Sequence, residues 1–291
     1  MSSLSYFTTP AGHRLALTVS GPEDGKPVLF FHGGGQTRHA WGRAVTELGK
    51  RGWRAIAVDM RGHGDSDRAD RYHAADFAVD LRALAEAQRE KPVIVGASLG
   101  GLAALLANAG TGASPGAPRE CSRALVLVDI APRQNTEGVN RILDFMAAHQ
   151  HGFDTLEEAA DAVAAYQPQR TQRADASGLK KNLRQHDDGR WYWHWDPKML
   201  ADFNRTRDEA RDQQTLYDAA ESLTQPVLLV RGAMSDVVDE TIVEEFRQRI
   251  PHARIADVSG AGHMVAGDRN SAFTDAVVDF LSRHHHPSDS T

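Results

Sequence analysis

Short apolar segments alternate with longer segments of helical periodicity along most of the chain. Five apolar runs are rich in aliphatic residues: 27–31 (PVLFF), 53–59 (WRAIAVD), 92–96 (PVIVG), 124–129 (ALVLVD) and 226–230 (PVLLV). None alternates with polar residues, which is typical of strands covered by helices on both faces. Residues 76–89 and 99–108 are predicted helices between them. This rhythm predicts a mostly parallel sheet flanked by helices.

Two segments depart from this rhythm. Residues 4–8 and 14–19, joined by a Pro-Ala-Gly turn, predict an antiparallel hairpin at the edge of the sheet. From residue 131 to 223 the sequence is helical and rich in polar residues, with no convincing strand before residue 226. We interpret 131–223 as a helical cap inserted into a core formed by residues 1–130 and 224–286.

The composition restricts the kinds of partner. The chain has 291 residues, of which 41% are hydrophobic and 25% charged, and this is ordinary for a globular protein with a large core. Its formal net charge of −6 is spread without a basic face, which argues against nucleic acid and anionic lipid as partners. A small-molecule substrate fits better, and self-association as a homodimer is left open.

Signals for export and for metal binding are weak. Cys121 is the only cysteine, so no intrachain disulfide can form. The N-terminal residues do not resemble a secretion signal, and no window approaches 18 uninterrupted apolar residues. We therefore expect a cytoplasmic protein that does not span a membrane. The three histidines at 284–286 are assigned no metal, and no metal site is predicted.

Ser98 lies in the strongest motif of the chain. Residues 96–100 read Gly-Ala-Ser-Leu-Gly, directly after an apolar strand and before an apolar helix. In this context the G-x-S-x-G pattern places a serine on a strained turn with its hydroxyl exposed. The sequence therefore predicts Ser98 as a nucleophile rather than an incidental turn serine.

A serine hydroxyl needs a base within hydrogen-bonding reach. Among fourteen histidines, His263 follows the predicted last strand, in a loop before the C-terminal helix. Loops at the carboxyl ends of parallel strands converge on one edge of the sheet, so we expect this loop near Ser98.

An acid is expected to orient the imidazole of this base. Asp236 follows the strand at 226–230 and is our first choice. Asp129, at the end of the strand at 124–129, is the alternative acid, although an aspartate there also suits a capping role.

Backbone N–H groups are expected to stabilise an oxyanion. Glycines 33–35 follow the first parallel strand, and Leu99 follows the nucleophile. We predict Gly34 and Leu99 as the two donors, with Gly35 as a substitute for Gly34. His32 and His63 also flank glycines, and we expect both to shape the pocket wall. A phosphate-binding loop is the rival interpretation, but the segment lacks the lysine of a G-K-[ST] motif.

In this order, the motifs resemble those of the α/β-hydrolase superfamily over nearly the whole chain. The residues that carry the resemblance are 32–35 (HGGG), 59–66 (DMRGHGDS), 96–100 (GASLG), Asp236 and His263. The resemblance implies an eight-stranded sheet, a cap over the pocket, a covalent acyl-enzyme and no cofactor. Epoxide hydrolases and haloalkane dehalogenases carry aspartate at the nucleophile position, so Ser98 argues against both.

The activity expected from the resemblance is hydrolysis of an ester, thioester or lactone. Carbon–carbon bond hydrolysis, perhydrolase or haloperoxidase-like chemistry with the same triad, and a binding protein on a hydrolase fold remain alternatives. In the cap, Trp191, Trp193 and Trp195 share one face at strand spacing and either line an apolar pocket over Ser98 or pack the cap against the core.

Overall fold

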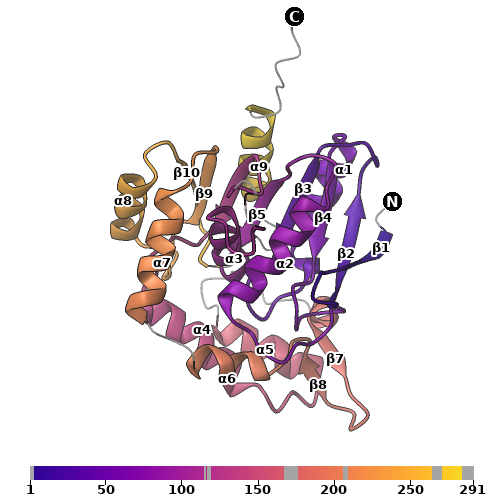
Figure 1. The fold of residues 1–291 in the computed structure, drawn as a ribbon. Coiled ribbons are helices and arrows are strands. Elements are labelled where there is room, and N and C mark those ends of the chain that lie inside the picture. Colours follow the sequence, from indigo (N-terminus) through magenta and orange to yellow (C-terminus); the bar gives the residue numbers. More distant parts are fainter. Residues whose placement is uncertain are drawn as a thin grey trace, which may run out of the picture.

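A single eight-stranded sheet forms the centre of the molecule in the computed structural model (Figure 1), which describes residues 3–114, 116, 119–166, 176–205, 209–263 and 271–283. The strand order is β1-β2-β4-β3-β5-β6-β9-β10. β1 and β2 pair antiparallel, as do β2 and β4, and the remaining neighbours are parallel. The strands are β1 (Ser3–Thr8), β2 (Arg14–Ser20), β3 (Pro27–Phe31), β4 (Arg54–Val58), β5 (Val93–Ala97), β6 (Ala124–Val128), β9 (Val227–Gly232) and β10 (Arg254–Val258). The predicted sheet and its edge hairpin are confirmed.

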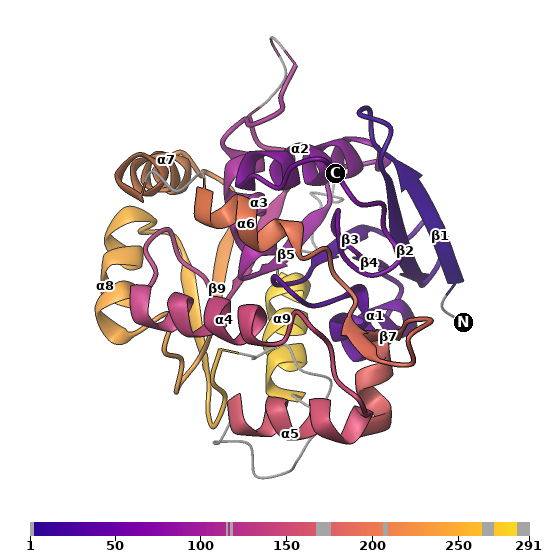
Figure 2. The ribbon, with the colours of Figure 1, turned by 90° about the horizontal axis from the view of Figure 1, so that it is seen from below.

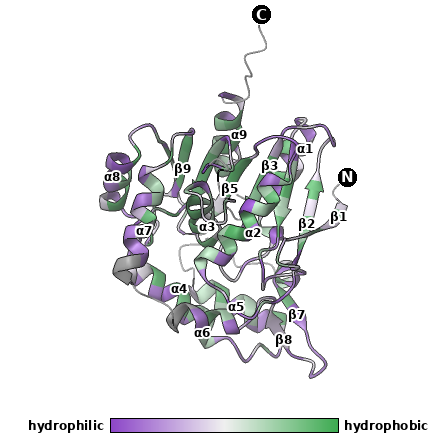
Figure 3. Cartoon of the chain, in the orientation of Figure 1, coloured by the Kyte–Doolittle hydropathy of each residue, from purple (hydrophilic) through white to green (hydrophobic). Residues whose placement is uncertain are grey.

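Helices cover both faces of the sheet because the strands are apolar on both sides. In β3, Val28 and Phe30 pack in one cluster, and Leu29 and Phe31 pack in another. The first cluster contains α1 (Gly42–Lys50), which follows the short helix η1 (Arg38–Trp41), and α9 (Ser271–Arg283). The second contains α2 (Ala74–Glu86), α3 (Leu99–Asn108) and α8 (Glu240–Arg249). Figure 3 shows apolar residues concentrated in the central strands and α3.

Between β6 and β9 the chain crosses the lower end of the sheet in Figure 1 and is seen face-on in Figure 2. We call residues 131–223 the cap segment. Its elements are α4 (Thr136–Ala148), α5 (Leu156–Tyr166), η2 (Ala176–Lys181), β7 (Leu183–Gln185), β8 (Trp191–Trp193), α6 (Lys198–Arg205) and α7 (Glu209–Glu221). The last of these, α7, packs against α3 and α8 of the sheet layer. The division of the chain at residues 131 and 223 stays a prediction, and residues 284–286 lie outside the described residues.

The cap segment contains β structure that the sequence analysis did not expect. β7 and β8 form an antiparallel pair in which Leu183 lies opposite Trp193. Residue 189, a glycine with φ of 82°, makes the turn between them. Three-residue strands are too short to produce a recognisable alternation of polar and apolar residues, so this pair was missed.

Backbone hydrogen bonds join the cap segment to the loop that follows β4. Gly64 N–H donates to the His194 carbonyl at 2.8 Å, and Asp196 N–H donates to the Gly62 carbonyl at 2.7 Å. An ion pair between Arg184 and Asp65, at 2.6 Å, lies beside them. The cap segment is therefore hydrogen-bonded directly to the loop after β4. This loop lies at the carboxyl ends of the parallel strands, as does Ser98. Among the described helices, none is long and apolar enough to cross a membrane.

Candidate active site

Ser98 occupies the sharp turn between β5 and α3. Its backbone has φ of 45° and ψ of −116°, a strained conformation for a residue with a side chain. The turn is tight enough that a Cβ on Gly96 would lie 2.5 Å from the Gly100 carbonyl oxygen. Glycines are therefore required on both sides of Ser98, as the motif predicts. Among the described residues, this hydroxyl has no hydrogen-bonding partner.

His263 is held by Asp129. The Nδ1 atom of His263 lies 2.7 Å from Oδ2 of Asp129, which is fully buried, whereas the histidine side chain keeps 12% of its surface exposed. Asp129 directly follows Val128, whose carbonyl accepts the Ser98 N–H at 3.3 Å. The pair formed by Asp129 and His263 therefore lies beside the Ser98 turn.

The Asp129 carboxylate receives two further hydrogen bonds. Gly232 N–H donates to Oδ1 at 3.0 Å, and the Ser235 hydroxyl donates to Oδ2 at 2.5 Å. The Ser235 oxygen in turn accepts the N–H groups of Val237 and Val238, each at 3.1 Å. A buried carboxylate requires such donors, because burial without them would favour its protonated form. The loop after β9 thus fixes both oxygens of Asp129.

The expectation that Asp236 orients His263 is wrong. Asp236 follows β9 at the carboxyl end of the parallel strands, as we predicted. Its carboxylate, however, pairs with Arg141 of α4 at 3.1 Å and not with His263. Its side chain is 36% exposed and that of Arg141 is 57% exposed. The inward position in this loop is taken by the neighbouring Ser235, so Asp129, our alternative acid, is the carboxylate that contacts His263.

Two backbone N–H groups remain without a partner among the described residues at the predicted oxyanion position, those of Gly34 and Leu99. A Cβ placed on Gly34 would lie 3.9 Å from Cδ2 of Leu99, so the two residues are neighbours. The N–H groups on either side of Gly34 are occupied: Gly33 donates to Oε1 of Gln36 at 3.1 Å, and Gly35 donates to Nε2 of His63 at 3.2 Å. Gly35 is therefore a poor substitute for Gly34.

Two buried histidines brace this glycine loop. Nδ1 of His32 lies 2.8 Å from the Gly33 carbonyl, and its Nε2 accepts the Met60 N–H at 3.0 Å. His63 uses Nδ1 toward the Arg61 carbonyl at 3.0 Å. Burial lowers the pKa of His32 to about 4 and, with the adjacent His32, lowers the pKa of His63 to about 3. Both rings are neutral at pH 7, as their accepting Nε2 atoms require.

The expectation that His32 lines the substrate pocket is wrong. Its side chain is fully buried and both ring nitrogens are hydrogen-bonded within the protein, so the residue supports the glycine loop from the protein interior. The same expectation for His63 is wrong for the same reason, because its ring is buried and both of its nitrogens are engaged within the protein. The contribution of Ser235 was missed in the sequence analysis. Ser235 could have been noticed because it precedes the expected acid, Asp236, in the loop after β9, where the carboxyl ends of the parallel strands converge.

The three cap tryptophans do not act as one surface. Trp195 is 4% exposed and belongs to the main core cluster, whereas Trp191 packs against a small cap cluster around Phe153. Trp193 contacts both clusters and lies edge-on to Phe153, with ring centroids 5.4 Å apart. The interpretation that the tryptophans pack the cap against the core describes Trp195, whereas Trp191 packs within the cap. A pocket role for Trp193 stays a prediction.

Within the part of the chain that the structure describes, no group of three or more histidine, cysteine, aspartate or glutamate side chains is arranged to hold a metal ion.

The chain belongs to the α/β hydrolase family, whose model matches residues 28–276, and it is a hydrolase of that fold. An esterase of Mycobacterium tuberculosis is 31% identical over 267 residues, which cover 86% of this chain and 80% of the esterase. A 3-hydroxybutyrate-oligomer hydrolase of Cupriavidus necator is 27% identical, with 88% and 89% of the two chains covered. The crystal structure of E-2-(acetamidomethylene)succinate hydrolase superimposes with a TM-score of 0.81 at 24% identity, covering 97% of this chain and 100% of that one, which supports the fold alone.

Proposed function

We propose that the protein is a serine hydrolase that cleaves an ester, thioester or lactone of a small, mainly apolar molecule through an acyl-enzyme at Ser98. The observation that carries this proposal is the hydrogen bond between His263 Nδ1 and the buried Asp129 carboxylate, beside the strained turn at Ser98. A histidine held through Nδ1 presents Nε2 as a base, which is the arrangement that activates a serine hydroxyl.

The reaction begins when His263 removes the proton of the Ser98 hydroxyl as its oxygen attacks the substrate carbonyl. The negative charge that develops on the carbonyl oxygen is stabilised by the free N–H groups of Gly34 and Leu99. His263 then gives its proton to the departing alcohol or thiol, and the acyl group remains on Ser98. In the second half, His263 activates a water molecule, which releases the acid and restores the serine.

Asp129 stabilises the imidazolium that forms in each half and fixes which ring nitrogen carries the proton. The hydrogen bonds from Gly232 and Ser235 hold this carboxylate in place in its buried position. An apolar substrate is supported by the apolar side chain of Met146 of α4, which lies close to the glycine loop: a Cβ added to Gly35 would meet its Cε at 3.2 Å.

Hydrolysis of p-nitrophenyl esters from acetate to decanoate tests the proposal. We expect turnover by the natural protein and a loss of kcat of at least about 10⁴-fold in Ser98→Ala, because removal of a triad serine leaves only binding and oxyanion stabilisation. Ser282→Ala, at an exposed position of α9, is the matched control and retains full activity.

The other outcomes identify the alternatives. Full activity in Ser98→Ala contradicts the proposed nucleophile. Absence of turnover on every ester, with Ser98 still labelled by a fluorophosphonate, favours carbon–carbon bond hydrolysis or transfer to peroxide as acceptor. Absence of labelling favours the binding protein on a hydrolase fold.

A further inference from the structure

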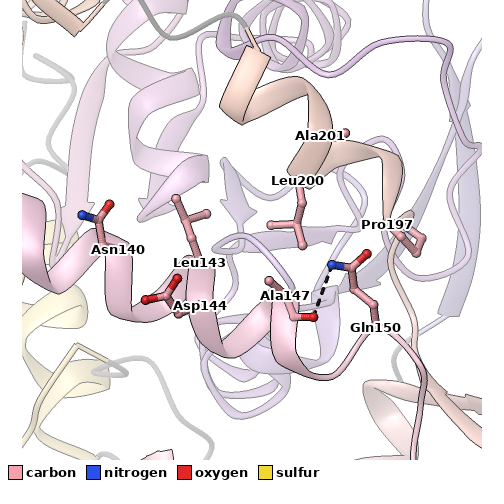
Figure 4. Close-up of a pocket in the computed structure, with 8 residues that line it drawn as sticks. All are labelled: Asn140, Leu143, Asp144, Ala147, Gln150, Pro197, Leu200 and Ala201. Carbon is pink, nitrogen blue, oxygen red and sulfur yellow. Dashed lines mark hydrogen bonds between the residues drawn. The ribbon is translucent and has the colours of Figure 1, made fainter.

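The β7–β8 hairpin (residues 183–193) links the cap segment to the glycine loop (residues 33–35). The Thr37 hydroxyl, two residues beyond this loop, lies 2.9 Å from Oδ1 of Asn182, which directly precedes β7, and 3.2 Å from the Lys181 carbonyl oxygen. The groove of about 320 Å³ between α4 and α6 takes no part in this link, because its lining is mostly exposed and includes no residue of the hairpin (Figure 4). The hairpin is therefore the part of the cap segment through which the loop can be held.

The position of the glycine loop determines where the Gly34 N–H points. A Cβ on Gly33 would lie 3.3 Å from Cβ of Ser98, and the His32 carbonyl accepts the Gly100 N–H at 3.2 Å. An oxyanion donor is effective only when it lies about 2.7–3.1 Å from the oxygen that becomes charged. Contacts that fix the far end of the loop therefore contribute to the geometry of the proposed oxyanion site.

Arg38 anchors the chain just beyond the glycine loop. Its guanidinium pairs with Asp59 and, at 2.8 Å, with Asp65, and its side chain is only 6% exposed. Its backbone N–H also donates to Oδ1 of Asp59 at 2.6 Å. Burial lowers the pKa of Arg38, but the two carboxylates raise it by more, so the guanidinium stays charged. A buried cation is thus held between two carboxylates of the loop that follows β4.

Arg184 of β7 extends this array of alternating charges into the cap segment. Its guanidinium donates to Oδ1 of Asp65 at 2.6 Å, while Oδ2 of the same carboxylate faces Arg38. Burial raises the pKa of Asp65, but the hydrogen bonds from Arg38 and Arg184 lower it by more, so the net shift is downward. Burial and the Arg184 charge lower the pKa of His194 to about 4, so its neutral Nε2 can accept from Arg184 Nε at 3.3 Å.

The exposure of this ion pair indicates that its main effect is on position. The side chain of Arg184 is 49% exposed and that of Asp65 is 27% exposed. Ion pairs that are partly open to solvent add little to the stability of a fold. The guanidinium nevertheless fixes the direction of the Asp65 carboxylate, and Asp65 in turn contacts the buried Arg38.

We propose that Arg184 is a positioning residue of the reaction, which holds the glycine loop in place from the cap segment through Asp65 and Arg38. This inference rests on the proposed function, because it takes the Gly34 N–H as an oxyanion donor. An oxyanion donor stabilises the transition state more than the bound substrate, so its misplacement lowers kcat and leaves KM nearly unchanged.

Arg184→Gln tests this role. We expect kcat for p-nitrophenyl butyrate to fall at least fivefold, with KM within twofold of the natural value and no change in the midpoint of urea unfolding. Arg184→Lys, which keeps a cation opposite Asp65, should recover at least half of the natural kcat.

Arg190→Gln is the matched control. Arg190 directly precedes β8 in the same hairpin, and it pairs with Asp154 within the cap segment, so its replacement should leave kcat within twofold of the natural value. An unchanged kcat in Arg184→Gln, a loss confined to KM, or equal losses of kcat in Arg184→Gln and Arg190→Gln overturn the proposal.

Hydrogen exchange separates failure of this inference from failure of the proposed function. The amides of Gly35, Gln36 and Arg38 are hydrogen-bonded within the protein. We expect their exchange to be at least fivefold faster in Arg184→Gln and unchanged in Arg190→Gln. Faster exchange supports the positioning role even if the natural protein turns over no ester. Equal exchange in the natural protein and Arg184→Gln overturns the role whatever the outcome of the activity assays.

Discussion

The loops that follow β6 and β9 each carry an aspartate at the same edge of the sheet, but the two carboxylates have opposite surroundings. Asp129 is fully buried and accepts hydrogen bonds from His263, Gly232 and Ser235. Asp236 is 36% exposed and pairs with an exposed arginine. The comparison teaches that the position of an acid along the chain is a weaker guide to its role than the hydrogen-bond donors that surround its carboxylate.

The loops after β6 and β9 together build the surroundings of the Asp129 carboxylate. The loop after β6 supplies the carboxylate, and the loop after β9 supplies the donors that hold it, through the Gly232 N–H and the Ser235 hydroxyl. Ser235 is itself fixed by two backbone N–H groups of its own loop. The proposed acid therefore depends on both loops, and substitutions in each should have effects of different size.

Asp129→Asn should have the largest effect. The amide cannot stabilise an imidazolium and favours the wrong tautomer of His263, so we expect kcat/KM for p-nitrophenyl butyrate to fall about 10³- to 10⁴-fold. Circular dichroism and thermal unfolding check that the fold is kept. If Asp236→Asn shows the larger loss, our comparison of the two loops is wrong.

The histidines also differ in burial: His32 and His63 are buried and support the glycine loop, whereas the His263 side chain is partly exposed. Burial lowers the pKa of His32 to about 4 and of His63 to about 3, from an ordinary 6.5. Below pH 6.5 these two histidines bind protons in the unfolded chain but stay neutral in the folded protein, so the free energy of unfolding falls as the pH drops from about 6.5 toward 4. Each histidine lowers the free energy of unfolding by at most about 1.4 kcal/mol for each pH unit.

Urea unfolding at pH 7.5, 6.5 and 5.5 measures this loss of stability. His63→Gln keeps an acceptor for the Gly35 N–H but does not titrate, so its stability should depend less steeply on pH than that of the natural protein. His186→Gln, at an exposed position on the cap segment, should leave the slope unchanged. Identical slopes in all three proteins would show that the buried pair does not couple to folding.

Ser235→Ala should have an intermediate effect. Without the Ser235 hydrogen bond, the Asp129 carboxylate is held less firmly and orients His263 less well. We expect kcat/KM to fall about tenfold, equivalent to about 1.4 kcal/mol. Ser235→Thr, which keeps the hydroxyl, should restore the rate. A loss of thermal stability with an unchanged kcat/KM would assign Ser235 a purely structural role.

Asp236→Asn should have the smallest effect. It removes only a partly exposed ion pair with Arg141, and such pairs contribute about 0–1 kcal/mol. We expect activity within about threefold of the natural protein and little change in the midpoint of urea unfolding. A loss comparable to that of Ser235→Ala would mean that Arg141 and Asp236 take part in substrate binding.

The sheet and the nucleophile turn could be predicted because each has a local cause. Apolar strands separated by helices specify the layers, and the glycines around Ser98 are required by close contacts that no other residue satisfies. His263 could be selected by its place after the last strand. These features depend on neighbours in the sequence or on the common edge where parallel strands end.

The choice between the two aspartates could not be made in this way. Asp129 and Asp236 both follow strands at that edge, and only side-chain direction, set by the turn at Ser235 and by the buried donors around Asp129, distinguishes them. The same holds for His32, which the glycine-rich motif suggested as a pocket residue and which tertiary packing buries.

Mapping of fluorophosphonate adducts by mass spectrometry tests the central claim most directly, because labelling needs an activated serine but no particular substrate. We predict one adduct, at Ser98, formed at similar rates in the natural protein and in Asp236→Asn and much more slowly in Asp129→Asn. An adduct on another serine, or slower labelling in Asp236→Asn than in Asp129→Asn, would contradict the assignment of Ser98, His263 and Asp129.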